Sequence, residues 1–151
     1  MAKFYLCILQ TAPKKIYQRN LTSTPECVSP KRTEKNYFLS ELKEADAVFF
    51  NGGDTRKLLA QLRTCPDLQS YVENKTVAGS SAGAYALAAY GASHTEKIVR
   101  SGLGFVPLRV ICHYESQTLP PSSESVTMLE QTAQNLELVH LKDYEWRVFQ
   151  I

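Results

Sequence analysis

The sequence lacks the long apolar runs and the signal segment that mark membrane and secreted proteins. Its longest apolar runs, Phe4–Leu9 and Ala86–Tyr90, fall far short of the roughly 20 residues that a membrane-spanning helix needs. The amino terminus leads directly into a strand-like run and carries no signal-peptide cleavage pattern. We therefore expect a soluble cytoplasmic protein without a membrane partner.

Clustered cysteines and an excess of one charge are also missing. The four cysteines contain no C-x-x-C pair, which argues against structural zinc and against a disulfide scaffold, so we expect reduced thiols: these are Cys7, Cys27, Cys65 and Cys112. Lysine and arginine total 17 against 15 acidic residues, giving a net charge of +2. This balance provides no basic surface typical of nucleic-acid binding.

What the sequence does contain is the composition and patterning of one globular domain over residues 1–151, with 44% hydrophobic residues. Strand-like runs alternate with helical patterns from residue 33 onward, which predicts an α/β sandwich around a mainly parallel sheet. The expected strands are Lys3–Leu9, Ala47–Phe50, Thr76–Gly79, Leu108–Cys112, Leu136–Leu141 and Trp146–Ile151. The expected helices are Thr33–Glu44, Arg56–Arg63, Leu68–Glu73, an alanine-rich helix from Ser81 to about Ala89, and Ser122–Gln134. Gln10–Lys31, with three prolines, is expected to be a long irregular connection that could cover a site.

The segment Gly79–Gly83 matches the pattern G-x-S-x-G at a predicted junction between a strand and a helix. A nucleophile on a tight, strained turn needs small neighbours, because larger side chains would make the backbone collide with itself. Ser81 is therefore the candidate nucleophile, and the N–H of Ala82 can point at a developing oxyanion. The alternative is a helix start whose small residues allow close packing against the sheet.

A second small-residue turn, Asn51–Thr55, ends the strand Ala47–Phe50. Its two glycines allow a ligand to approach the backbone closely, so Gly53 is a candidate second oxyanion donor. The alternative is a tight turn in which Asp54 or Thr55 caps the next helix. Both interpretations can hold at once.

Among the three histidines, His113 is the candidate base, because it follows a strand and would lie at the same sheet edge as Ser81. His94 lies in a polar segment and is expected to be solvated, and His140 is expected to be a surface strand residue. The base needs an orienting carboxylate. Asp143 and Glu145 both precede the last strand, and the pattern does not separate them.

Chain order favours this assignment. Ser81, His113 and Asp143 occur in the order nucleophile, base, acid, whereas α/β-hydrolases have the order nucleophile, acid, base. The hydrolase order would require Glu115 or Glu124 followed by His140. It would leave His113 without a role and would need a larger domain, so it is disfavoured.

Taken together, these motifs resemble the peptidase E (aspartyl dipeptidase) and cyanophycinase family of serine peptidases over roughly residues 45–114. The motifs that carry the resemblance, in order, are Gly52–Thr55 with Leu58–Leu59, Ala78–Ala84, Gly102–Pro107 and His113–Tyr114. The resemblance implies a three-layer α/β/α sandwich like that of class I glutamine amidotransferases, with serine in place of the usual cysteine.

The resemblance also implies roles for individual residues. Ser81 would be the nucleophile, His113 the base, and Gly53 with Ala82 the oxyanion donors. Asp143 is preferred over Glu145 as the acid, because the family places its acid in a context that Leu141-Lys142-Asp143 and Trp146 match. Glu96 is the nearest counterpart of an additional acid found in some members. Asp54 and Glu115 are the expected substrate-binding acids.

Three departures from the family pattern affect these implications. The stretch before Gly52 is short by roughly one βα unit, which leaves an apolar sheet margin that a partner in a homodimer could cover. Tyr114–His140 contains no lysine or arginine, whereas family members that cut after an amino-terminal aspartate use an arginine there. Asp54 stands where the dipeptidases usually have asparagine.

We therefore predict a serine exopeptidase or dipeptidase that acts on short peptides and requires no metal ion or organic cofactor. An esterase or amidase with a non-peptide acyl substrate is the first alternative, because the same triad chemistry serves other leaving groups. A shortened relative that binds peptides without turnover is the second.

Overall fold

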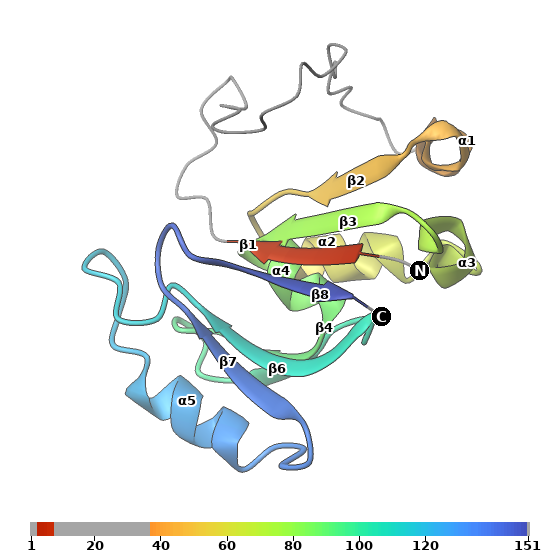
Figure 1. Ribbon diagram of the computed structural model, residues 1–151. Helices are drawn as coiled ribbons and strands as arrows, with labels where there is room; N and C mark the ends of the chain where they lie inside the picture. The colour runs from red at the N-terminus through yellow and green to blue at the C-terminus, as the bar shows by residue number, and fades with distance from the viewer. Residues whose placement is uncertain (1–2, 8–36, 151) are drawn as a thin grey trace.

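The strands form two four-stranded sheets that meet at a short central helix, α4 (Figure 1). The computed structural model describes residues 3–7 and 37–150. The first sheet has the strand order β2-β3-β1-β8, and the second has the order β5-β4-β6-β7. The strands are β1 (Lys3–Cys7), β2 (Ala47–Phe50), β3 (Thr76–Ser80), β4 (Ala88–Ala92), β5 (Val99–Ser101), β6 (Val106–Cys112), β7 (Glu137–Leu141) and β8 (Trp146–Gln150). The helices are α1 (Phe38–Glu44), α2 (Thr55–Leu62), α3 (Leu68–Val72), α4 (Ala82–Leu87) and α5 (Ser123–Glu130).

Strand pairing is mainly parallel in both sheets. In the first sheet β3 pairs in parallel with β1 and β2, and in the second β6 pairs in parallel with β4 and β7. The antiparallel pairs are β1 with β8 and β4 with β5. The predicted α/β class with a mainly parallel arrangement flanked by helices is confirmed, although the strands are divided between two sheets where we expected one.

Helix α4 is the element that joins the two halves. It contacts β1, β2 and β3 of the first sheet and also β4 and β6 of the second. Helix α2 packs against α4, and α5 packs against the second sheet at β4, β5 and β6. Figure 1 shows α2, α3 and α4 on one side of the first sheet, with α5 beside the second.

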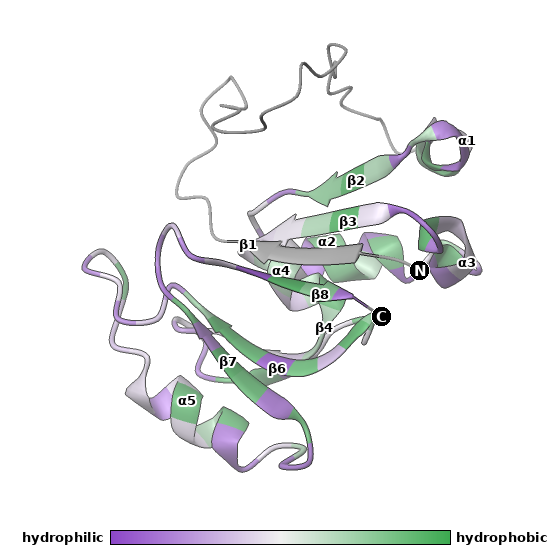
Figure 2. Ribbon diagram, in the orientation of Figure 1, coloured by the Kyte–Doolittle hydropathy of each residue, from purple (hydrophilic) through white to green (hydrophobic). Residues whose placement is uncertain are grey.

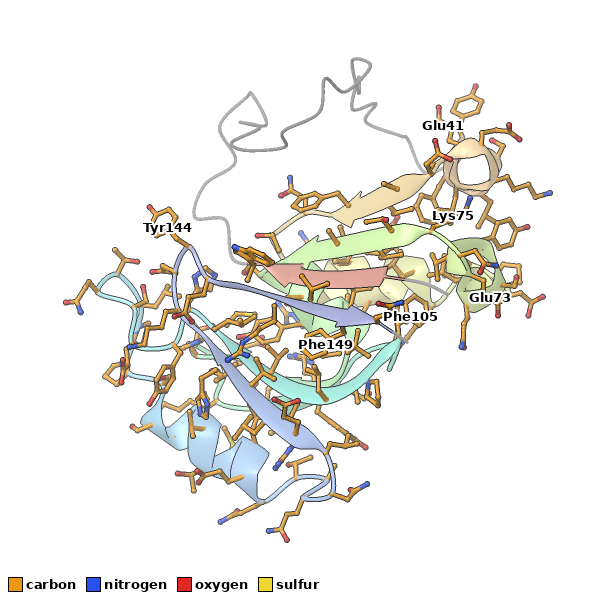
Figure 3. The ribbon with its side chains drawn as sticks, viewed as in Figure 1. Glu41, Glu73, Lys75, Phe105, Tyr144 and Phe149 are labelled. Atoms are coloured by element: carbon orange, nitrogen blue, oxygen red, sulfur yellow. The ribbon has the colours of Figure 1, made fainter. Side chains whose placement is uncertain are left out.

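The hydrophobic core follows this central helix and its neighbouring strands. Leu87 at the end of α4, Val77 on β3 and Val110 on β6 are fully buried. Figure 2 shows the corresponding hydrophobic colouring along much of β6. Phe105 and Phe149 pack against the same core from its margin, where β8 approaches the second sheet (Figure 3). The core therefore runs between the sheets and holds them together.

The prediction that the alanine-rich helix continues to about Ala89 is wrong. Helix α4 ends at Leu87, and Ala88–Ala92 forms β4, which pairs with β6 and β5. Alanine favours helices in isolation, but pairing on both sides and complete burial of Ala88 override that preference. Gly91 fits this strand because a Cβ there would overlap the ring of Tyr85.

The other expected elements that the structure describes are present with small shifts at their ends. The short strand β5 was not anticipated. The predicted irregular connection Gln10–Lys31 lies outside the described residues, as does the beginning of the first predicted helix. Cys65 and Cys112 are reduced thiols, as expected, whereas Cys27 and the Cys7 side chain lie outside the described part. Within the described residues, no helix is long and apolar enough to cross a membrane.

Candidate active site

Ser81 occupies a strained turn between β3 and α4. Its backbone has φ 51° and ψ −106°, a conformation that non-glycine residues rarely adopt. Two glycines make the turn possible: a Cβ on Gly79 would lie 2.5 Å from the Gly83 carbonyl carbon, and a Cβ on Gly83 would overlap the carbonyl oxygen of Phe50. The turn has the strained strand-to-helix geometry expected from G-x-S-x-G. Its glycines are therefore required by close backbone packing.

A histidine and a carboxylate continue from the Ser81 hydroxyl in one hydrogen-bonded line. His113 Nε2 lies 3.0 Å from Ser81 Oγ, and His113 Nδ1 lies 2.6 Å from Asp143 Oδ1. His113 follows β6, and Asp143 lies in the connection from β7 to β8. The His113 and Asp143 side chains are only 14% and 17% exposed, so this hydrogen-bonded pair is largely shielded from water.

The partners of His113 fix the proton arrangement of its neutral ring. An ionised carboxylate can only accept, so Nδ1 carries the hydrogen and donates it to Asp143. Nε2 is then an acceptor for the Ser81 hydroxyl, as a general base requires. His113 itself has a positive φ of 56°, so both ends of the Ser81–His113 bond are on strained backbone.

Ser116 extends the line beyond the carboxylate and was missed from the sequence. Its hydroxyl donates to Asp143 Oδ2 over 2.9 Å, so both oxygens of Asp143 are held by side chains. Ser116 lies three residues after His113, in a short turn where its N–H bonds to the His113 carbonyl. A serine three positions after His113 in the sequence was the available signal, but serines are too common in turns for the pattern to single it out.

Two side chains hold Cys112, the residue that precedes His113. The Tyr85 hydroxyl accepts a hydrogen bond from the Cys112 N–H over 3.0 Å and lies 3.5 Å from the Cys112 carbonyl oxygen. His94 Nε2 lies 2.5 Å from that oxygen. Burial raises the pKa of Tyr85 well above its usual value, so the hydroxyl stays protonated. These contacts fix the end of β6 and hence the position of His113.

The expectation that His94 is solvated is therefore wrong. Its side chain is buried, and Nδ1 also faces the carbonyl oxygen of Pro120. The polar sequence around His94 suggested exposure, but the fold brings the Cys112 carbonyl within hydrogen-bond reach of the ring and so compensates its burial.

The Asn51–Thr55 turn lies against Ser81. A Cβ on Gly52 would be 3.5 Å from the Ser81 Cβ, so the backbone of this turn approaches the serine closely. Gly53 has φ +138°, which favours glycine. Asp54 caps α2 by accepting from the N–H groups of Arg56 and Lys57, and the bond from Lys57 is the largest influence lowering the pKa of Asp54. The capping interpretation of Asp54 is confirmed.

A cleft of about 440 Å³ opens over the Ser81 hydroxyl and the His113 ring. Its wall includes Gly53 and Asp54 from the β2–α2 turn, and Tyr85, His94 and Leu119 from other parts of the chain. Among residues 3–7 and 37–150, no group of three or more histidine, cysteine or acidic side chains is arranged to hold a metal ion.

One wall of this cleft carries alternating charges. Arg56 Nε lies 3.7 Å from Asp54 Oδ1, and Arg56 Nη1 lies 3.3 Å from Glu96 Oε1. Arg100 Nη2 donates to the other oxygen of Glu96 over 2.6 Å. This hydrogen bond is the main influence that lowers the pKa of Glu96, which is therefore ionised at neutral pH. The two arginines were not singled out from the sequence, because they lie far apart in the chain.

The remaining predicted residues lie in other interactions. The Glu145 carboxylate accepts from the N–H of Lys142, so the structure joins Asp143 rather than Glu145 to His113. Glu115 pairs with the Lys142 ammonium over 2.6 Å, a bond that lowers the pKa of Glu115, and both side chains are more than half exposed. Glu115 is not among the cleft-lining residues. His140 packs its ring edgewise against Tyr114, with centroids 4.6 Å apart.

Comparison with known families agrees with the resemblance. The model of Peptidase family S51 matches residues 11–150, which is more than half of the chain. A search among curated proteins gives no match.

Proposed function

This chain belongs to peptidase family S51, a family of serine peptidases, and on that premise we propose that it hydrolyses short peptides as an exopeptidase or dipeptidase. The observation that carries the proposal is the hydrogen-bonded line from the Ser81 hydroxyl through His113 to Asp143. The open cleft above this line gives a peptide access to the serine. A hydroxyl, an imidazole and a carboxylate in this order are the parts of a nucleophilic triad.

In the proposed reaction, Ser81 Oγ attacks the scissile carbonyl carbon while His113 Nε2 takes the hydroxyl proton. His113 then gives this proton to the leaving amine, and the C–N bond breaks to leave an acyl-serine. A water molecule, deprotonated by His113 in the same way, attacks the acyl-serine and releases the acid. Asp143 holds the ring tautomer and stabilises the imidazolium that forms in each step.

The N–H groups of Gly53 and Ala82 are the proposed donors to the oxyanion. Ala82 directly follows the nucleophile, and the approach of the Gly52 backbone to Ser81 supports the participation of the neighbouring glycine. Donors of this kind typically contribute about 3 kcal/mol each to transition-state stabilisation, because they are fixed before charge develops.

The test is labelling with a fluorophosphonate, which reacts with activated serines and does not depend on knowledge of the substrate. We expect one adduct per chain, located at Ser81 by mass spectrometry. Ser81→Ala should abolish both labelling and hydrolysis of a dipeptide panel without lowering the thermal unfolding midpoint. Ser123→Ala, which changes an exposed serine at the start of α5, is the matched control and should label normally. Labelling at another serine, or peptide hydrolysis that survives Ser81→Ala, would refute the proposal.

The same panel should include aryl esters and simple amides. If these compounds react and no dipeptide does, the enzyme is an esterase or amidase that uses the same serine. If the chain binds peptides but neither turns over substrate nor reacts with the probe, it is a binding protein.

A further inference from the structure

We infer that Arg56 and Arg100 bind the free carboxylate of a short peptide and thereby select substrates that end a few bonds beyond the scissile amide. This inference rests on the proposed function, which it deepens by naming the part of the substrate that the cleft recognises.

The two arginines reach the cleft from separate elements. Arg56 lies in the first turn of α2, directly after the turn that contains Gly53, and Arg100 lies on β5 of the other sheet. Both line the cavity that contains Ser81 and His113. The Arg100 side chain is only 29% exposed, which places its charge in a less hydrated position than that of an ordinary surface arginine. The cleft thus has cationic groups even though the segment Tyr114–His140 supplies none.

Glu96 holds the two guanidinium groups without using all their donors. It contacts one nitrogen of each: Nη1 of Arg56 and Nη2 of Arg100. A guanidinium has five N–H donors in a planar fork that suits carboxylates. In the described part of the chain, Nε and Nη1 of Arg100 have no hydrogen-bond partner within the protein. Because Glu96 fixes the charged heads, less side-chain freedom is lost when a carboxylate binds to the remaining donors.

The order of charges along the wall matches a peptide with two free ends. Asp54 is adjacent to Gly53, the proposed oxyanion donor, and accepts its two backbone bonds through Oδ1. Its other oxygen therefore suits the ammonium group of an amino-terminal residue whose carbonyl lies at Ser81. Ion pairs continue from Asp54 to Arg56 and through Glu96 to Arg100. In the inferred binding mode, the carboxyl end of the leaving amino acid pairs with these two arginines. Negative and positive side chains therefore alternate along this wall, which complements a zwitterion and gives the wall no net charge.

This arrangement distinguishes short free peptides from other acyl compounds. An amide or ester at the carboxyl end removes the negative charge and leaves the arginines paired only with Glu96 and Asp54. A long peptide places a neutral peptide group where the carboxylate would be. The proposed selectivity is therefore for the carboxyl end of the substrate and is independent of its amino-terminal side chain.

The experiment compares each dipeptide that the wild-type protein hydrolyses with its carboxyl-terminal amide. We expect kcat/KM to be at least about tenfold higher for the free acid, as one charge-assisted hydrogen bond supplies. Arg100→Gln should lower the ratio of kcat/KM for the acid to kcat/KM for the amide to near one. Arg100→Lys, which keeps the charge but loses the planar fork, should give an intermediate ratio. Arg56→Gln should act in the same direction.

Lys57→Gln is the matched control, because it removes a neighbouring positive charge on α2 from a side chain that does not line the cleft. It should retain the wild-type ratio of acid to amide. Equal kcat/KM for acid and amide in the wild-type protein, or a full preference for the acid in both Arg100→Gln and Arg56→Gln, would overturn this inference while leaving the proposed peptidase intact. Failure to hydrolyse any peptide, together with failure of the fluorophosphonate to label Ser81, would overturn both.

Discussion

Replacement of Asp143 by asparagine tests the proposed triad of Ser81, His113 and Asp143 at its carboxylate. Asparagine has the same shape, but it removes the negative charge that lies 2.6 Å from His113 Nδ1. Its amide nitrogen can also donate where the carboxylate only accepts, which favours the tautomer with the hydrogen on Nε2. That tautomer cannot take a proton from Ser81.

The size of the effect follows from the surroundings of the pair. The imidazolium formed during attack and the carboxylate are both more than four-fifths buried. Two opposite charges with centres about 4 Å apart attract by about 4 kcal/mol at an effective dielectric constant of about 20. This energy corresponds to about a thousandfold in rate, and the wrong tautomer extends the expected loss towards about ten-thousandfold.

The assay is the second-order rate of fluorophosphonate inactivation, with peptide turnover as a parallel measurement. Glu145→Gln is the matched control, because Glu145 is a neighbouring acid whose carboxylate accepts from the Lys142 N–H. We expect Glu145→Gln to react at the wild-type rate. The reasoning is refuted if Asp143→Asn stays within about tenfold of wild type while folded, or if Glu145→Gln loses as much reactivity as Asp143→Asn.

Two further predictions concern residues that hold the proposed triad in place. Ser116→Ala removes the donor to Asp143 Oδ2, so it should lower both kcat and the rate of fluorophosphonate inactivation about tenfold, with little change in KM. Ser116→Thr keeps a hydroxyl and should restore most of the rate. An unchanged rate in Ser116→Ala would show that this bond is dispensable. Gly83→Ala should destabilise the fold by about 3 kcal/mol or more, as measured by chemical denaturation, because its Cβ would overlap the carbonyl oxygen of Phe50. Gly52→Ala is the control for stability, because its Cβ would meet neighbouring atoms at ordinary contact distances of 3.5 and 3.6 Å. Equal unfolding free energies for the two glycine variants would contradict the packing argument.

The central part of the site could be anticipated from sequence because it depends on local rules. A serine between two glycines at the end of an apolar strand predicts a strained turn, and a histidine directly after another apolar strand lies at the same sheet edge. These rules predict that Ser81 and His113 lie close together. The choice between Asp143 and Glu145 needed the resemblance to the family, because residue pattern alone places both acids before the last strand.

The features that were missed depend on contacts between distant segments. Ala88–Ala92 has the composition of a helix, and only its pairing with β6 on one side and β5 on the other makes it a strand. His94 lies among polar residues, but the fold places the Cys112 carbonyl against its ring. The pairing of Arg56 with Glu96 joins α2 to the β4–β5 turn across 40 positions of sequence, and no local pattern encodes such a contact.

The division of the strands into two sheets has a consequence for how activity is lost on heating. Ser81 follows a strand of the first sheet, His113 follows a strand of the second, and Asp143 lies where the chain passes from one sheet to the other. A slip of about 1 Å between the sheets would stretch the 3.0 Å contact between serine and histidine, and a misplacement of that size can cost about a hundredfold in rate. We therefore expect the proposed peptide hydrolysis to be lost during gentle warming before the secondary structure melts.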